Sequence, residues 1–302
     1  MTSRRASDPW LTAMRRADFA TAWQISDRVL TERCARREDC SRWPRHLQFI
    51  WTGAPLDGKD VLVRCYHGLG DTIQYARFLE PLRRRARKIS VWAQPALLRL
   101  LTHVRGCDEL LPLHDGVPQT CYDVDIELME IAHALRITLD DLPGPIPYIH
   151  IAPPSTPDSE RARTCLHVGI AWRSGSWDPT RSIAPSALAP LSNIPGIALH
   201  SLQFPPEPLP FAVDDLACRD IERMAQRMLS LDLVISVDTM VAHLAGALGL
   251  PTWVLLNDEP DWRWCDDRID SPWYPTMRLF RRRSNDWKPL LAHVTAALMR
   301  SA

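Results

Sequence analysis

The sequence predicts a protein of the α/β class, with two domains that are each built around a parallel sheet. Three observations predict it. Strand-like and helical runs alternate from Lys59 onward, a proline-rich stretch at 142–157 divides this region, and a strand–turn–helix pattern occurs on both sides of it. At 302 residues the chain is long enough for two domains. We therefore expect a helical segment at 1–54, a first α/β domain at 55–150 and a second at 151–302.

The segment before the first domain is expected to be helical. Apolar residues recur at roughly helical spacing from Trp10 to Leu30, and a charged, irregular stretch follows from Arg33 to Arg45. The segment resembles one unit of a helical repeat, but a single unit cannot establish a repeat array.

The first α/β domain is expected to begin with a strand, a glycine turn and a helix. The predicted elements, in order, are a strand at 61–67, a turn at 68–71, a helix at 72–86, a strand at 89–94, a helix at 95–104 and a strand at 109–113. Residues 124–135 hold another strand or the edge of a helix. The alternation indicates a parallel sheet.

The second domain repeats the pattern. Strands are expected at 166–172, 197–204, 233–237 and 254–256, and helices at 187–191, 221–231 and 286–300, with a further helix directly after 237. One possible arrangement is that the last helix, at 286–300, packs against the first domain.

Composition excludes several classes of protein. The chain is 46% hydrophobic and 24% charged with zero net charge, which is typical of a soluble globular protein and not of a nucleic-acid binder. No apolar run has the length of a membrane span, and the N-terminus lacks a signal-peptide core, so we expect a cytoplasmic protein. The eight cysteines form no CxxC pair, which argues against a zinc or iron–sulfur site.

The segment SVDTMVAHLAGALG, residues 236–249, is the most informative part of the chain. Asp238 and Thr239 stand at a helix start and are both preferred N-cap residues. A helix start that follows a strand presents N–H groups and partial positive charge, and phosphate is a frequent ligand there. His243 lies near the first turn and could add a hydrogen bond, although a lone histidine on a helix is more often structural.

Two further turns carry candidate groups. In GLGD, residues 68–71, Gly68 and Gly70 would allow positive φ and close backbone approach, and Asp71 begins a helix after the first strand. Asp71 could instead serve only as a helix cap. In RSGSWDPTR, residues 173–181, arginines and hydroxyls suit an oxyanion, although a polar surface loop has the same composition. The tryptophans at 262, 264, 273 and 287 are expected to pack in the interior. Alternatively, the tryptophan at 262 or 264 could form one wall of a pocket for a nucleotide base.

The strings DTMVAHLAGALG and HGLGDT resemble motifs of the heptosyltransferase-like glycosyltransferases of family 9. The strings GIAWRSGS, HSLQ, DWRW and DSPWYPTMRLFR are similar to the bacterial branch that carries tetratricopeptide repeats ahead of this domain. The resemblance covers about 55–300, and its motifs are specific when taken together.

The resemblance implies a GT-B fold, in which two Rossmann-like domains face a cleft. It also implies an inverting transferase that needs no metal or other cofactor. The first domain would bind a glycan, lipid or protein acceptor, and the second an ADP-, UDP- or GDP-linked sugar. No nucleic-acid partner is implied, and a peripheral position at the inner membrane stays open.

The resemblance also implies roles for single residues. Asp71 matches the general base, in a turn with Gly68, Gly70 and Thr72 on the acceptor side. On the donor side, the leaving diphosphate would be held by His243, by the backbone N–H groups of Thr239, Met240 and Val241, and by Arg173, Ser174 or Arg181. Asp238 would hold the turn or a sugar hydroxyl, and Gln203 would face the same cleft.

The chain departs from the family pattern at two positions. Arg181 stands in for a lysine of the loop after the first strand of the second domain, and Met240 replaces a glycine beside the phosphates. The donor is therefore left open, and ADP-heptose is not assumed.

Two alternatives remain from the sequence. One is a non-catalytic binding module of the same fold, whose N-terminal helices dock a partner. The other is a nucleotide-sugar epimerase, which would need additional carboxylates around the sugar.

Overall fold

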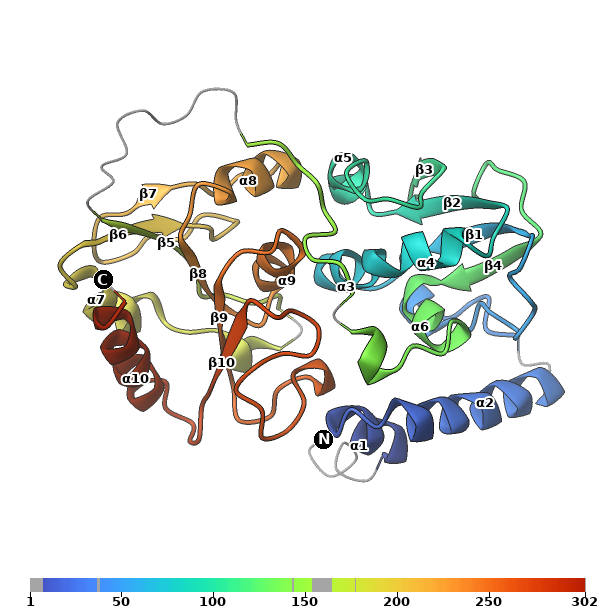
Figure 1. Ribbon diagram of the computed structural model, residues 1–302, viewed down its shortest axis with the longest axis horizontal. Coiled ribbons are helices and arrows are strands. Elements are labelled where there is room, and N and C mark those ends of the chain that lie inside the picture. The colour runs from blue at the N-terminus through green and yellow to red at the C-terminus, as the bar shows by residue number, and fades with distance from the viewer. Residues whose placement is uncertain (1–7, 37–38, 143, 154–164, 177, 302) are drawn as a thin grey trace. The chain divides into compact units, whose positions relative to one another are not determined.

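The computed structural model describes residues 8–36, 39–142, 144–153, 165–176 and 178–301. Its contacts divide the chain into two compact units (Figure 1). Unit 1 comprises Met1–Ile149 and Trp262–Asp267, and unit 2 comprises His150–Asp261 and Arg268–Ala302. Of the proline-rich stretch, residues 143 and 154–157 lie outside the described part of the chain.

Unit 1 is built around a four-stranded parallel sheet in the order β3-β2-β1-β4. The strands are β1 (Asp60–Arg64), β2 (Lys88–Ala93), β3 (Glu109–Pro112) and β4 (Val124–Glu127). The central strand β1 is buried through its three middle residues, as expected for a parallel sheet covered on both faces.

The helices of unit 1 are short apart from the second one. They are α1 (Pro9–Arg15), α2 (Phe19–Arg36), α3 (Leu69–Tyr75), α4 (Leu79–Arg83), α5 (Leu98–Leu101) and α6 (Ile131–Ala134). The single helix expected over 72–86 is broken by a 3-10 turn at Ala76–Phe78. Pro81 explains the break, because it cannot donate to the carbonyl of Arg77 and its ring crowds that carbonyl.

The N-terminal helices belong to unit 1. Asp8 caps α1 by accepting hydrogen bonds from the N–H groups of Trp10 and Leu11. The helix α1 packs against α2 and against a 3-10 turn at Trp262–Trp264. The expected helical segment and the first α/β domain therefore form one unit, which is completed by a short piece of chain from much later in the sequence.

Unit 2 contains a six-stranded parallel sheet in the order β10-β9-β8-β5-β6-β7. The strands are β5 (Leu166–Ala171), β6 (Ile197–Ser201), β7 (Asp214–Asp215), β8 (Leu233–Val237), β9 (Thr252–Leu256) and β10 (Met277–Arg281). Both edge strands, β7 and β10, were not among the expected elements.

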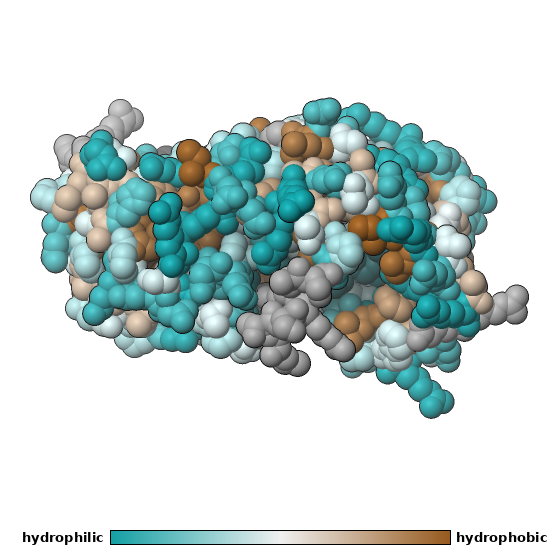
Figure 2. All heavy atoms as spheres, turned by 90° about the horizontal axis from the view of Figure 1, so that it is seen from below, coloured by the Kyte–Doolittle hydropathy of each residue, from teal (hydrophilic) through white to brown (hydrophobic). Residues whose placement is uncertain are grey.

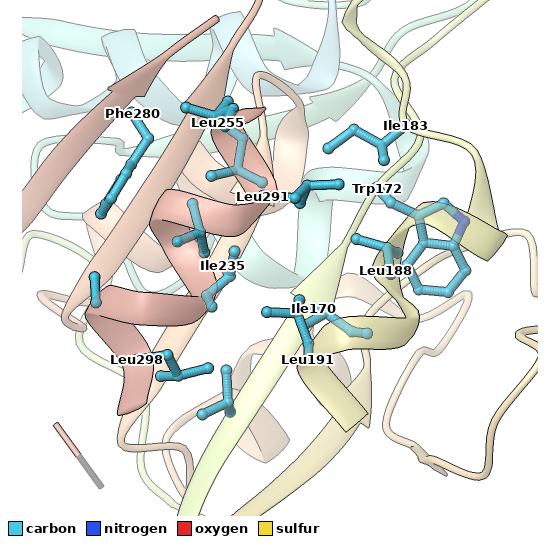
Figure 3. Packing of buried hydrophobic residues seen from close by; sticks show 14 of the residues in the cluster. Ile170, Trp172, Ile183, Leu188, Leu191, Ile235, Leu255, Phe280, Leu291 and Leu298 are labelled. Carbon is cyan, nitrogen blue, oxygen red and sulfur yellow. The ribbon is translucent and has the colours of Figure 1, made fainter. Parts of the chain in front are cut away.

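Helices cover the two faces of this sheet. On one face, α10 (Lys288–Met299) packs against α7 (Ala189–Ser192) and β10, and their apolar side chains interdigitate with those of the strands (Figure 3). On the other, α9 (Met240–Ala247) packs on β8, β9 and α8 (Ile221–Met228). The last helix thus lies in unit 2, and the later part of the chain that joins unit 1 is Trp262–Asp267 instead.

The α/β class and the parallel sheets are as predicted. Within the described residues, no helix combines the length and apolar character that crossing a bilayer requires.

Close packing explains one of the small residues of α9. A Cβ atom added to Gly246 would lie 2.3 Å from Cδ1 of Tyr274, and Tyr274 is fully buried. The tyrosine ring therefore occupies the space that a side chain at this helix position would need.

We predict that Gly246→Ala lowers the free energy of unfolding by about 1–3 kcal/mol, the usual cost of overpacking a core. Helix propensity alone predicts the opposite sign, a gain of up to about 1 kcal/mol. Urea denaturation distinguishes the two. Gly116→Ala, in an exposed loop where the added Cβ would meet only the exposed side chain of His114, is the control, and a stabilised Gly246→Ala variant would contradict the packing argument.

Candidate functional site

Each sheet has one point at which the strand order reverses. In unit 1, the chain goes from β1 to β2 and β3 on one side and returns to β4 on the other. In unit 2, it goes from β5 to β6 and β7 and returns to β8. Ligands of open α/β sheets bind at the carboxyl ends of the strands at such a point. The loops after β1 and β4, and those after β5 and β8, are therefore the expected ligand sites of the two sheets.

Asp71 lies in the first turn of α3, directly after β1. Its Oδ2 accepts a hydrogen bond from the Gly68 N–H at 2.9 Å, and its Oδ1 accepts one from Nη2 of Arg263 at 2.5 Å. Asp71 thus caps its helix, which was one of the two roles expected from the sequence. It also forms an ion pair with Arg263 of the Trp262–Asp267 segment.

The turn before Asp71 differs from the expectation in its backbone. Gly68 has φ −67°, and Gly70 lies inside the first turn of α3, so neither provides the expected positive φ. Gly68 serves close approach instead, because an added Cβ would lie 3.1 Å from Oδ2 of Asp71. Thr72 is buried and donates to Oε1 of Gln94, whose amide in turn donates to the His67 carbonyl, so Thr72 holds the turn in place.

Arg263 was not among the expected site residues. Its side chain is 9% exposed, and its guanidinium lies 4.8 Å from the ring centre of Trp262 and 5.9 Å from that of Tyr75. Its Nη2 is also 3.8 Å from Sδ of Met129, which follows β4. Aromatic faces stabilise a cation at such distances, so the arginine is held rigidly against Asp71.

Glu127, the last residue of β4, is a second carboxyl group at the same point of the sheet. Its Oε2 accepts a hydrogen bond from the Met129 N–H at 2.8 Å and lies 3.8 Å from Nε2 of His67. Burial, together with the nearby carboxylates of Glu130 and Asp71, raises the pKa of Glu127 to about 8. Burial likewise lowers the pKa of His67. At neutral pH, an uncharged acid and an uncharged imidazole therefore lie beside the Asp71–Arg263 pair.

In unit 2, the strand β8 leads into the start of α9. Thr239 is the N-cap, in an extended conformation, and its side chain makes no capping hydrogen bond. The amide of Ala242 bonds the Thr239 carbonyl at 3.1 Å, and Met240 and Val241 precede it. Amides at this place in a helix have no partner within the helix, which is the geometry of an anion site.

A buried polar chain runs behind this helix start. Nη1 of Arg181 donates to Oδ2 of Asp238 at 3.1 Å, and Oδ1 of Asp238 lies 3.9 Å from Nε2 of His243. On its other side, Nδ1 of His243 lies 3.1 Å from the hydroxyl of Tyr274. Arg181 also lies 3.7 Å from Asp178. The structure therefore brings the expected residues Arg181, Asp238 and His243 together and adds Tyr274 to them. The positive charge of Arg181 is balanced by the carboxylates of Asp238 and Asp178.

The loop after β5 uses its other candidate groups to hold its own shape. Oε1 of Gln203 accepts from the N–H groups of Trp172 at 3.3 Å and Arg173 at 2.9 Å. The guanidinium of Arg173 pairs with Glu207, with Nε 2.7 Å from Oε2. The Ser174 hydroxyl donates to the Asp178 carbonyl at 2.9 Å. The expected loop is thus a braced structure in which Arg173 is half exposed.

Trp262, Trp264 and Trp273 lie in the interior as expected, whereas Trp287 is only partly buried. Trp262 packs edge-to-face on Trp10 with ring centres 5.4 Å apart, and Trp264 and Trp273 are almost completely buried. In the portion of the chain that the structure describes, no three His, Cys, Asp or Glu side chains are grouped so as to hold a metal ion.

Comparison with known sequences gives one distant relative. No family model matches the chain. It is 24% identical to Protein FlbA of Caulobacter vibrioides over 294 residues, which covers 82% of this chain and 48% of that protein. The chain therefore spans about half the length of the curated relative that it matches.

Comparison with solved structures gives the fold. The E. coli ADP-heptose lps heptosyltransferase II is similar with a TM-score of 0.56 and 12% identity, over 80% of this chain and 100% of that one. A glycosyl transferase family 9 protein from Veillonella parvula is similar with a TM-score of 0.52 and 14% identity, over 76% of this chain and 87% of that one. The iron-containing heptosyltransferase TibC from enterotoxigenic E. coli, in complex with ADP-D-beta-D-heptose, is similar with a TM-score of 0.53 and 11% identity. The match covers 82% of this chain and 79% of that one. The predicted GT-B class, with two Rossmann-like α/β units, is confirmed.

We predict that Arg181 and Asp238 are strongly coupled. Arg181→Met leaves a buried carboxylate with its main cationic partner removed, and we expect a loss of about 3 kcal/mol or more in the free energy of unfolding. In the double variant with Asp238→Asn, the loss should be smaller than the sum of the single losses by about 1 kcal/mol or more. Urea denaturation of the four proteins measures this coupling.

Arg85→Met is the matched control, because Arg85 pairs with Asp57 on the surface. It should unfold close to the wild type. Additive effects of Arg181→Met and Asp238→Asn would refute the coupling.

Proposed function

We propose that the protein is a glycosyltransferase that moves a sugar from a nucleotide-sugar donor to a hydroxyl group of an acceptor. The observation that supports it most is the position of the polar residues. A carboxylate stands at the switch point of one sheet, and a helix start with anion-binding geometry stands at that of the other. The GT-B fold makes this combination meaningful, since a transferase needs both a base and a site for a diphosphate.

Unit 2 is proposed to bind the donor. As the bond between the anomeric carbon and the diphosphate breaks, negative charge grows on the leaving nucleoside diphosphate. The amides of Met240 and Val241 and the positive end of α9 would stabilise that charge. His243 is held by Tyr274 and Asp238 one turn further on, which would fix its ring for a hydrogen bond to the same group.

Unit 1 is proposed to activate the acceptor through Asp71. Its two oxygens each accept one hydrogen bond within the protein, and an ionised carboxylate has about four lone-pair sites. Capacity therefore remains to accept the proton of an acceptor hydroxyl as its oxygen attacks the anomeric carbon. A single displacement of this kind inverts the configuration at that carbon, so we propose an inverting reaction.

The donor is proposed to be an ADP-, UDP- or GDP-linked sugar, and ADP-heptose is the first to test because two of the similar structures are named for it. Amides, His243 and the charge of α9 supply the electrostatic stabilisation, so the proposed reaction requires no metal ion. A cytoplasmic location is part of the same proposal.

We predict that Asp71→Asn lowers the transfer rate by roughly 100-fold or more, the usual contribution of a general base. Donor affinity should be unchanged, because the substitution lies in unit 1. Asparagine can accept from only one of Gly68 and Arg263, so the free energy of unfolding of the variant is measured beside its activity. Transfer is measured with radiolabelled donor, and donor binding by thermal shift of the full chain.

Asp57→Asn, which breaks only the surface pair with Arg85, serves as the control and should keep wild-type activity. His243→Gln should lower the transfer rate as well. Full transfer activity in both Asp71→Asn and His243→Gln would overturn the proposed function. Donor binding without any transfer in the wild type would favour the binding module.

We predict that prolonged dialysis against EDTA leaves the transfer rate within about two-fold of its starting value, because the proposed stabilisation of the leaving group comes from protein groups. Activity is assayed before and after dialysis and after adding Fe²⁺, Mg²⁺ or Mn²⁺. Loss of activity that one of these ions restores would show that the reaction depends on a metal.

A further inference from the structure

Unit 1 contains a cavity of about 580 Å³ that the proposed function does not use. It lies among α1, α2, the segment 43–51 and the loops after β1 and β4. Six aromatic side chains contribute to its lining: Trp10, Trp23, Trp43, Phe49, Trp51 and Tyr75. Its volume is within the range of small-molecule sites.

Three of the indoles that line this cavity have their N–H groups bonded to protein oxygens. Nε1 of Trp10 donates to Oγ of Ser26 at 3.1 Å, and Nε1 of Trp23 donates to the Ile137 carbonyl at 2.6 Å. Nε1 of Trp51 donates to the Ala54 carbonyl at 2.9 Å. Because these donors are satisfied by the protein, the three rings offer apolar contact rather than hydrogen bonds.

The cavity opens through an apolar rim. Val29, Trp43, Leu47 and Phe49 all line it and are 39%, 38%, 50% and 37% exposed. Figure 2 shows apolar groups among polar ones on the face that carries the N-terminal helices. Large apolar side chains gathered around an opening mark a binding site for an apolar group.

One buried polar atom belongs to the same cavity. Glu127 lines it, its residue is only 5% exposed, and Oε1 has no hydrogen-bond partner among the described residues. A buried polar atom without a partner destabilises the protein, and a ligand that supplies the partner removes this penalty. The cavity thus combines largely apolar walls with several polar side chains, among which Glu127 offers a buried oxygen without a partner in the described part of the chain.

One wall of the cavity is shared with the Asp71 site. His67 and Met129 both line the cavity. His67 lies in the turn before Asp71, and Sδ of Met129 is 3.8 Å from the arginine that pairs with Asp71. A group bound in the cavity would therefore lie next to the proposed base.

We propose that this cavity binds the acceptor, and that the acceptor is an uncharged apolar alcohol whose oxygen meets Glu127. Its role as acceptor rests on the proposed function, whereas the binding of an apolar alcohol does not. A bare glycan fits less well, because its hydroxyls would face the aromatic and aliphatic side chains that form the larger part of the lining.

The protonation state of Glu127 decides between an alcohol and a cation. The titratable groups around it are His67, Asp71, Glu130 and Cys65, with Arg263 beyond Asp71, and Arg33, His46 and His133 line the same cavity. Burial and the two carboxylates keep Glu127 protonated at neutral pH, with a pKa of about 8. A protonated carboxyl donates a hydrogen bond to a ligand oxygen, whereas an ionised one would favour an amine.

Three probes test the ligand class on the full chain: cyclohexylmethanol, the amine of the same size cyclohexylmethylamine, and the larger polar methyl glucoside. Binding is followed by tryptophan fluorescence and by saturation-transfer NMR at pH 7. We expect cyclohexylmethanol to bind at least 10-fold more tightly than the other two. Equal or tighter binding of the amine or the glucoside would overturn the proposal.

Variants locate the binding and test the proton. Glu127→Gln keeps an uncharged donor and should bind cyclohexylmethanol within about 3-fold of the wild type, whereas Glu127→Ala should lose 10-fold or more. Above pH 8, wild-type binding should weaken about 10-fold per pH unit, because the ionised acid cannot donate, and Glu127→Gln should not follow this trend. Trp43→Ala should weaken binding, and Val117→Ala, exposed elsewhere, should not.

Equal losses in Glu127→Gln and Glu127→Ala, or a wild-type affinity that does not change with pH, would overturn the proposal. The assay of transfer separates this inference from the proposed function. Saturable binding of the alcohol without transfer from any donor would contradict the function and leave the cavity assignment standing. Transfer to acceptors that do not compete with the alcohol would contradict the assignment and leave the function standing.

Discussion

The ion pair between Asp71 and Arg263 ties the Trp262–Asp267 segment to the rest of unit 1. It joins residues 192 positions apart, and it fixes the Trp262–Asp267 segment against the carboxyl end of β1. The same segment packs on α1 through Trp262 and Trp10. Trp10 of α1 and Met129, which both contact this segment, also line the cavity of unit 1. The N-terminal helices, the candidate base and the cavity therefore all depend on the position of Trp262–Asp267.

Much of the fold could be predicted from the sequence, and the misses have physical causes. Apolar runs identified the strands at the centres of both sheets, since these are buried on both faces. The edge strand β10 was missed because Arg278 and Arg281 interrupt its apolar pattern, and β7 is only two residues long. The helix over 72–86 was predicted as continuous because its pattern is regular, although Pro81 divides it.

The candidate site was only partly predictable. Residues within one motif, such as Asp238 and His243, could be placed because a strand, a turn and a helix follow one another in the chain. Arg263 could not, because its pairing with Asp71 depends on a tertiary contact that leaves no local pattern. Glu127 was missed because 124–135 did not distinguish a strand from a helix, so the end of β4 was not located. The positive φ expected in the glycine turn was wrong, since Gly68 is needed for the approach of a carboxylate.

The return of Trp262–Asp267 to unit 1 means that the chain passes between the units three times. A fragment that ends at Ile149 would lack Trp262 and Arg263, and would leave Trp10 and Asp71 without these neighbours. The halves are therefore not interchangeable modules. A chimaera that takes residues 150–302 from a homologue would have to keep this chain's own Trp262–Asp267, because a crossover at the central linker alone separates that segment from the residues it pairs with.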